Sequence, residues 1–148
     1  MKIIFIGFMG SGKSTLAKAL SERIHFTLLE MDQQACEKTQ TRNIPELFSK
    51  GGELLLREME IEIAKECRAK EQLIISTGGG VVMNKIIIDY LKEHQGKVFF
   101  LHVSFETITQ RLQGDSSRPL FQEVAQAKAL YDFRLPLYQR YADYVIQR

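Results

Sequence analysis

The chain has 148 residues, which is enough for one domain with a single sizeable hydrophobic core. Hydrophobic residues make up 45% of it and charged residues 26%, which excludes a disordered or fibrous protein. The formal net charge of +2 is too small to indicate a nucleic-acid or membrane partner. The two cysteines, Cys36 and Cys67, form no Cys-x-x-Cys pair and predict neither a zinc site nor a disulfide framework. We expect free thiols in a reducing cytoplasm.

Short apolar runs alternate with helical patterns along the chain. Strands are predicted at about 3–6, 26–29, 73–76, 97–103 and 144–146. Helices are predicted at about 13–23, in the 30s through Lys38, after Pro45 to Lys50, and at 53–70, 85–93, 106–112 and 125–141. Gly51 and Gly52 break the helical pattern, and Pro136 is expected to bend or interrupt the last helix. No apolar run approaches the length of about 18 residues that a membrane span needs. Because a strand-like segment lies at the N-terminus, we expect no signal peptide. The alternation predicts one α/β domain, residues 1–148, in which helices cover both faces of a five-stranded parallel sheet.

The segment Gly7-Phe8-Met9-Gly10-Ser11-Gly12-Lys13-Ser14 fits the pattern G-x-x-x-x-G-K-[ST]. It lies between a predicted strand and a predicted helix, which is the context that this phosphate-binding loop requires. Its backbone N–H groups surround phosphate oxygens, and the helix dipole adds partial positive charge. Lys13 then reaches the outer phosphates and the Ser14 hydroxyl binds Mg²⁺. A loop of this kind names neither the acceptor nor the reaction.

Further polar and glycine-rich signals indicate an acceptor site beside this loop. Asp32 follows the second strand, and Gly78-Gly79-Gly80 follow the third. The carboxyl ends of parallel strands share one edge of a sheet, where ligands bind, so these residues are expected near the loop. Arg57 and Arg134 are candidates for pairing a carboxylate there, and Arg118 for reaching the transferred phosphate.

With these residues the sequence resembles the shikimate kinase family. The resemblance extends in order over residues 1 to about 145 and includes Gly7 to Thr15, Leu28-Leu29-Glu30-Met31-Asp32, Gly52-Glu53 with Arg57, Ser76-Thr77-Gly78-Gly79-Gly80, Arg118-Pro119-Leu120 and Arg134-Leu135-Pro136-Leu137-Tyr138. It implies transfer of the ATP γ-phosphoryl group to the 3-hydroxyl of shikimate, on the pathway to aromatic amino acids. It also implies the nucleoside monophosphate kinase fold, a three-layer α/β/α arrangement of the phosphate-loop NTPase type with a mobile lid.

The resemblance assigns roles to acceptor-side residues by position. Asp32 matches the aspartate that hydrogen-bonds the shikimate hydroxyls, and it is a candidate to accept the proton of the attacking hydroxyl. Arg57 and Arg134 match the arginines that grip the shikimate carboxylate, for which a planar guanidinium fork suits better than lysine. Gly79 and Gly80 match the glycines whose backbone approaches the acceptor, and Gly78 is grouped with them as substrate-binding.

On the ATP side, the resemblance implies binding by Gly10, Ser11, Gly12, Lys13, Ser14, Thr15, Arg111 and Arg118. Arg111 matches the arginine that stacks on adenine. Arg118 matches the lid arginine that closes on the phosphates and stabilises charge during transfer, so it is grouped with Lys13 and Asp32 as catalytic. The lid is expected at about 114–124 and the acceptor-binding helical region at about 32–60. We expect the lid to be raised or disordered without ligand and to close over it.

Two features depart from the family pattern. Glu30 stands where the family usually has the first aspartate of Asp-x-Asp, so Ser14 and Glu30 are the expected Mg²⁺ ligands. We expect the longer glutamate either to shift the metal or to weaken its binding. The family usually continues beyond the fifth strand into a loop that lines the adenine pocket and a final helix, whereas this sequence ends at Arg148.

Other interpretations remain open at this level. Arg57 can be a surface ion-pair partner of Glu53 or Glu60, and Asp32 can simply cap the following helix. Gluconate also carries a carboxylate and hydroxyls, so a gluconate kinase or a related small-molecule kinase is an alternative. A nucleotide-binding homologue without catalysis is a third. We expect ATP and shikimate as partners, no nucleic acid or membrane, and a monomer.

Overall fold

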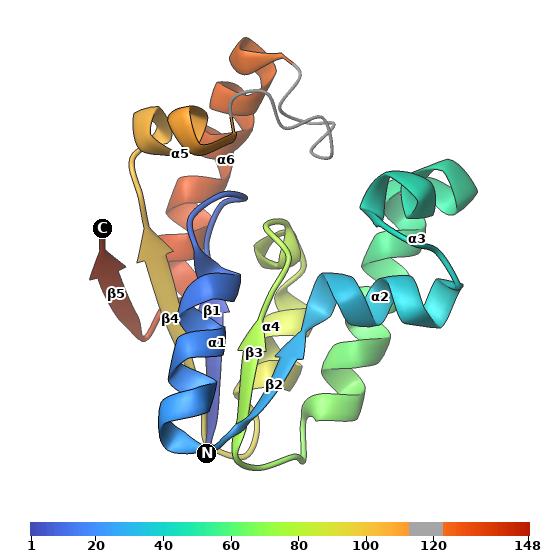
Figure 1. The fold of residues 1–148 in the computed structure, drawn as a ribbon, viewed down its shortest axis with the longest axis vertical. Helices are drawn as coiled ribbons and strands as arrows, with labels where there is room; N and C mark the ends of the chain where they lie inside the picture. Colours follow the sequence, from blue (N-terminus) through green and yellow to red (C-terminus); the bar gives the residue numbers. More distant parts are fainter. Residues whose placement is uncertain (113–122) are drawn as a thin grey trace.

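The computed structural model describes residues 1–112 and 123–148. In this part of the chain, five parallel strands form one sheet in the order β2-β3-β1-β4-β5 (Figure 1). The strands are β1 (Lys2–Ile6), β2 (Thr27–Glu30), β3 (Leu73–Ser76), β4 (Gly96–His102) and β5 (Tyr144–Gln147). The helices are α1 (Lys13–Ile24), α2 (Met31–Thr39), α3 (Ile44–Cys67), the 3₁₀ helix η1 (Val81–Met83), α4 (Lys85–Lys92), α5 (Phe105–Leu112) and α6 (Val124–Tyr141).

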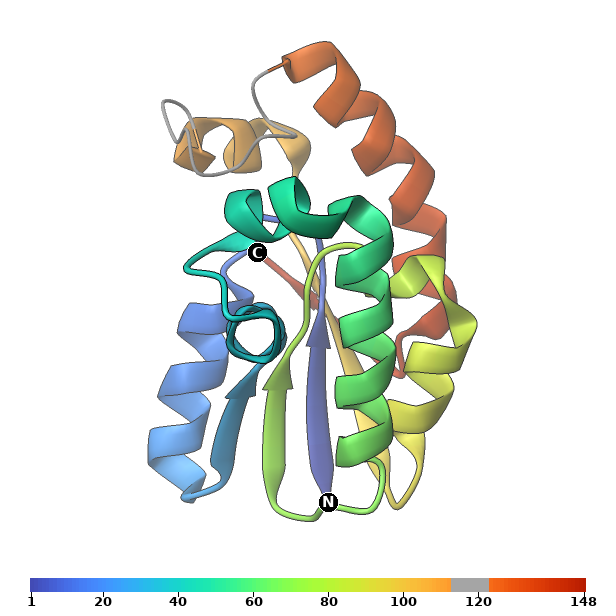
Figure 2. The same cartoon turned by 90° about the vertical axis from the view of Figure 1, so that its right-hand side faces the viewer.

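Helices cover both faces of the sheet, as the alternation predicted. Figure 2 shows α1 on one side of the strands and α3, α4 and α6 on the other. Successive residues of a strand point to opposite faces, so Ile4 and Ile6 belong to the large core cluster while Phe5 packs with Ala17 and Ile74 in a smaller one. Burial on both faces explains why the central strands β1 and β3 are mostly apolar.

The second strand lies one residue later than the sequence predicted. Glu30 pairs in register with Ser76 as the last residue of β2, and α2 begins directly at Met31. Asp32 therefore lies in the first turn of α2, where the helix dipole favours a carboxylate. This turn stands at the carboxyl edge of the sheet.

Helix α3 consists of two helical pieces joined at a kink. Gly52 has φ 69° and ψ −165°, a conformation outside the helical region, which confirms the predicted break at the glycine pair. The prediction that the second piece extends to Lys70 was wrong, because it ends at Cys67. The buried Lys2 ammonium donates there to the carbonyls of Cys67 and Arg68, at 3.1 and 2.6 Å, and so satisfies carbonyl groups at the helix end.

Helix α6 continues through Pro136, so of the two predicted outcomes, a bend or an interruption, the interruption does not occur. Pro136 lies on the exposed side of the helix. The opposite side carries the buried residues Tyr131, Arg134 and Tyr138, whose packing holds the helix together despite the missing N–H. Among the described residues, no helix has the length and apolar character that crossing a membrane requires.

Candidate active site

The loop between β1 and α1 has the geometry of a phosphate cradle. Gly10 and Gly12 adopt φ values of 79° and 95°, which a side chain would disfavour, and Gly12 directly precedes the first turn of α1. The Lys13 side chain is buried and its ammonium donates to the carbonyl oxygens of Gly7 and Phe8 at 2.7 and 3.1 Å. The lysine thus lies folded along the loop, with its charge at the place where phosphate oxygens would be bound.

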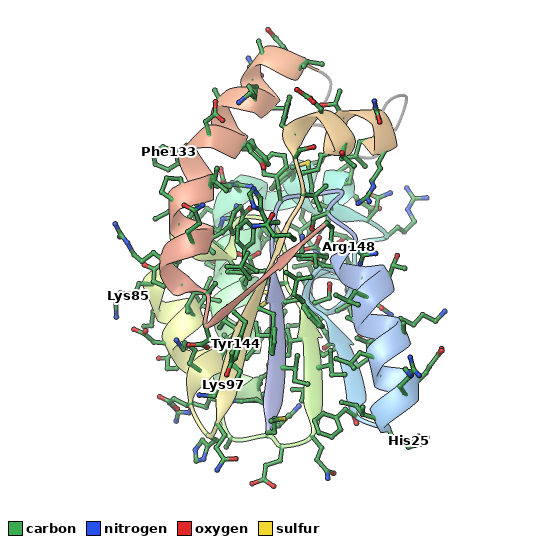
Figure 3. The ribbon with its side chains drawn as sticks, turned by 90° about the vertical axis from the view of Figure 1, so that its left-hand side faces the viewer. His25, Lys85, Lys97, Phe133, Tyr144 and Arg148 are labelled. Carbon is green, nitrogen blue, oxygen red and sulfur yellow. The ribbon has the colours of Figure 1, made fainter. Side chains whose placement is uncertain are left out.

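A cavity of about 390 Å³ opens over this loop. It is lined by the loop residues Met9 to Thr15 together with Asp32, Thr77, Gly78, Gly79, Arg111 and Arg148. Arg111, on α5, donates from Nη1 to the carbonyl of Gly10 at 3.2 Å. Arg148 follows β5 and its backbone N–H donates to the carbonyl of His102 at 2.9 Å, which fixes it beside the end of β4 (Figure 3). The cavity is therefore rich in cationic side chains.

A second cavity of about 470 Å³ adjoins the first. Its polar wall includes Asp32, Arg57, Glu60, Gly78 to Gly80 and Arg134, and its apolar wall includes Met9, Cys36, Ile44, Pro45, Phe48 and Leu56. Met9, Asp32, Gly78 and Gly79 line both cavities. Asp32 therefore stands at the junction between a phosphate-binding space and a space that is polar on one side.

Arg57 is held by two carboxylates rather than exposed on the helix surface. Its guanidinium pairs with Glu60 at 2.7 Å and with Glu53 at 2.9 Å, and only 17% of its side chain is exposed. Burial opposes the charge of this guanidinium, but Glu60 and Glu53 outweigh that effect and raise the pKa of Arg57. The ion-pair interpretation is therefore confirmed. The acceptor role of Arg57 stays a prediction, with which its place in the wall of the second cavity is compatible.

Glu60 is a site residue that the sequence offered only as an ion-pair partner. It is completely buried, and its Oε2 atom has no hydrogen-bond partner. Burial raises the pKa of Glu60 to about 6, although the charge of Arg57 opposes this shift. Its spacing of three residues after Arg57 was the available signal, but periodicity alone does not reveal burial of a charged residue.

Arg134 reaches the second cavity from α6, far from Arg57 in the sequence. It is 4% exposed, and its Nε atom has no hydrogen-bond partner. Burial lowers the pKa of Arg134. Of the ion pairs found in residues 1–112 and 123–148, none includes Arg134. A buried guanidinium without an ion-pair partner pays a desolvation penalty that a bound anion would offset.

The glycine triplet passes closely between these side chains. A Cβ atom at Gly78 would lie 2.8 Å from Asp32 Oδ1 and 2.9 Å from Glu60 Oε2, and one at Gly80 would lie 2.2 Å from Arg57 Nη2. Glycine is needed here because the backbone itself forms the wall against which the charged groups pack. The predicted approach of this backbone to an acceptor stays a prediction, whereas its packing against Asp32, Glu60 and Arg57 was not predicted from the sequence.

Two other predicted site residues, Arg118 and Glu30, are not among the described residues that line the two cavities. Arg118 and almost the whole expected lid lie outside the described residues. Glu30 ends β2 and, unlike Asp32, is not among the residues that line either cavity. Arg148 lines the loop cavity, and no motif in the sequence pointed to it.

The oxygen groups beside Lys13 suit Mg²⁺, the ion that usually accompanies a bound nucleoside triphosphate. Ser14 Oγ lies 3.3 Å from Ser76 Oγ, and Asp32 lines the same cavity as Ser14. Hydroxyl and carboxylate oxygens are the hard donors that Mg²⁺ prefers, and phosphate oxygens and water normally complete its shell. Among the described residues, no group of three or more His, Cys, Asp or Glu side chains forms a metal site. Ser14 and nearby carboxylates therefore fit a metal held mainly by the nucleotide.

The fold and the two joined cavities beside the phosphate loop indicate an α/β phosphotransferase of the phosphate-loop type. A family model described as shikimate kinase matches residues 9–148. The chain belongs to the shikimate kinase family. The shikimate kinase of Aquifex aeolicus (strain VF5) is 33% identical over 141 residues, covering 95% of this chain and 83% of that protein.

Solved structures agree with this assignment. The shikimate kinase from Acinetobacter baumannii in complex with shikimate superposes with a TM-score of 0.91 at 32% identity, covering 99% of this chain and 83% of the other. A gluconokinase from Sinorhizobium meliloti superposes with a TM-score of 0.61 at 14% identity, covering 99% of this chain and 81% of the other. That second likeness concerns the fold alone.

Proposed function

We propose that this chain transfers the γ-phosphoryl group of ATP to the 3-hydroxyl of shikimate, giving shikimate 3-phosphate and ADP. The observation that carries the proposal is the buried Arg134 guanidinium, which lies in a cavity that touches the phosphate loop and has no carboxylate partner among the described residues. A buried cation of this kind calls for an anionic ligand, and the carboxylate of shikimate supplies one. The hydroxyls of the same small molecule then face Asp32.

The binding step assigns different tasks to the two arginines. Arg134 meets the substrate carboxylate without a competing ion pair in the described structure, whereas Arg57 is already paired with Glu53 and Glu60. Two forks on opposite elements, α3 and α6, clamp one carboxylate and so orient the ring. The backbone of Gly78 to Gly80 closes the third side. This arrangement fixes which hydroxyl points toward the phosphate loop.

The transfer step takes place at the junction of the two cavities. Asp32 lines both, so its carboxylate is placed to orient the attacking hydroxyl and accept its proton. Lys13, the loop N–H groups from Gly10 to Thr15, and Arg111 hold the ATP, and Arg118 adds positive charge at the transferred group. Ser14 and a carboxylate, either Glu30 or Asp32, would hold Mg²⁺ beside the nucleotide, and the ion would supply positive charge that offsets the phosphates.

The proposal extends to the oligomeric state, the cellular compartment and the lid. Both cavities are lined by one chain, so the proposed reaction needs no second subunit, and we propose a monomer. The thiols of Cys36 and Cys67 are buried and unpaired, which suits a reducing cytoplasm. A lid near residues 114–124 closes over the nucleotide in this proposal and excludes water from the γ-phosphate.

The direct test is a coupled assay of ADP release with MgATP and shikimate, with the product identified by ³¹P NMR. Gluconate serves as the competing acceptor, and Lys13→Met serves as the matched inactive variant. We expect turnover with shikimate, a much lower kcat/KM with gluconate, and loss of turnover in Lys13→Met. Folded protein that binds ATP but does not phosphorylate shikimate would refute the proposal, as would a higher kcat/KM for gluconate.

A further inference from the structure

Helix α6 carries a second buried polar residue one turn after Arg134. Tyr138 is 1% exposed, and its ring stacks on Phe100 of β4 with centroids 5.1 Å apart and planes 22° apart. Its hydroxyl donates a hydrogen bond to the carbonyl oxygen of Gly79 at 2.5 Å. The phenol thus joins the helix that carries Arg134 to the middle of the glycine triplet.

Arg134 also lies close to Gly79, the glycine that Tyr138 holds by its hydrogen bond. The position of a Cβ atom at Gly79 lies 3.4 Å from Arg134 Nη1, so the guanidinium packs against the glycine backbone whose carbonyl Tyr138 holds. Burial raises the pKa of Tyr138, and the charge of Arg134 opposes that shift without cancelling it. The phenol therefore stays protonated and remains a donor throughout the working pH range.

We propose that Tyr138 is a positioning residue for the acceptor. Its hydrogen bond fixes the glycine loop against α6, and this fixes the direction in which the Arg134 guanidinium faces the substrate carboxylate. The inference deepens the proposed function and rests on it, because it concerns how the same cavity takes an anionic acceptor. Tyr138 touches neither substrate in this scheme and acts through Gly79 and Arg134.

The chain contains a matched control for the hydroxyl group. Tyr131 lies on the same helix, is 7% exposed, and donates from its hydroxyl to the carbonyl of Val103 at 2.7 Å. It packs against Phe8 and Phe105 and is not among the residues that line either cavity. Tyr131→Phe and Tyr138→Phe therefore each remove one buried hydroxyl bonded to a backbone carbonyl. Only the second removes a bond to the acceptor loop.

The expected result is a separation between substrate binding and turnover. Tyr138→Phe should raise KM for shikimate by about tenfold, the scale of one well-placed hydrogen bond near a charge. It should change kcat and KM for ATP by less than about twofold, because the phosphate loop keeps its own contacts. Tyr131→Phe should leave all three parameters within about twofold of the wild type. Both variants should lower Tm by similar amounts.

A double variant tests whether Tyr138 acts through Arg134. Arg134→Lys keeps the positive charge and a measurable activity but loses the planar fork. In that background, Tyr138→Phe should raise KM for shikimate by less than about threefold, since the two changes disrupt the same grip. A full tenfold effect in the Arg134→Lys background would overturn the inference. So would equal KM values for Tyr138→Phe and Tyr131→Phe, whereas a wild-type protein with no shikimate turnover would instead refute the proposed function itself.

Discussion

Replacing Gly80 by alanine should separate the fold of this protein from its acceptor binding. The backbone at Gly80 has φ −100° and ψ 7°, which alanine adopts readily, so the main chain is not strained. The new methyl group would, however, lie 2.2 Å from Arg57 Nη2 and 2.7 Å from Cζ. Ordinary contact begins near about 3.5 Å, so the guanidinium has to retreat by more than an ångström.

The displaced group is the end of a long, flexible side chain. Arg57 can therefore move while the fold stays intact, but it then leaves the position between Glu60 and the cavity. A charge-assisted hydrogen bond to the substrate contributes about 1.5–3 kcal/mol, which corresponds to about tenfold to a hundredfold in affinity. We expect KM for shikimate to rise within that range, with kcat falling much less and Tm falling by only a few degrees.

Steady-state kinetics with varied shikimate, together with thermal unfolding, would measure these effects. Gly79→Ala is a graded comparison in the same segment rather than an inert control. Its new methyl group would lie 3.4 Å from Arg134 Nη1 and from the Met9 backbone nitrogen and requires much smaller shifts, so its effect on KM for shikimate should be smaller than that of Gly80→Ala. The Gly80→Ala and Arg57→Ala effects on KM should also fail to add in the double variant. An unchanged KM for shikimate in Gly80→Ala would refute the reasoning, as would additive effects with Arg57→Ala.

Three further predictions concern the other charged groups of the site. Arg57→Ala should raise KM for shikimate by a larger factor than it lowers kcat. Arg118→Ala should instead lower kcat by a larger factor than it raises KM for shikimate. Equal changes in kcat and KM for both variants would contradict the assigned roles. Because burial raises the pKa of Glu60 from 4.5 to about 6, the native state holds this proton more tightly than the unfolded state. The contribution of Glu60 to the free energy of unfolding is therefore fully present below pH 4.5 and is lost as pH rises to about 6, by about 2 kcal/mol at most. Chemical denaturation across this range should show Glu60→Gln gaining stability relative to the wild type as pH rises, and a constant difference would contradict the assignment. Finally, Arg148→Ala should raise KM for ATP by about threefold to tenfold at low salt and by less at high salt, with KM for shikimate unchanged; a salt-independent effect would argue against a phosphate contact.

Most of the secondary structure could be predicted from the sequence because its signals are local. Within about two dozen residues, a strand, a turn and a helix are each signalled locally: by the apolar run Ile3 to Ile6, by the loop glycines and Lys13, and by the helical spacing that follows. The kink at Gly52 was predictable for the same reason. The end of α3 was misplaced because a distant group decides it: the Lys2 side chain, on β1, donates hydrogen bonds to the carbonyls of Cys67 and Arg68 there.

The residues that line the second cavity were predictable as a set of residue types but not as an arrangement. The sequence alone determined that a phosphate loop is followed by an aspartate, a glycine triplet and two arginines in an order typical of shikimate kinases. The tertiary structure decided that Asp32 joins the two cavities and that Arg57 is already paired. It also decided that Arg134 is buried with no ion pair among the described residues. Burial and pairing depend on which helix crosses which strand, and these contacts join residues far apart in the chain, so local sequence patterns do not encode them.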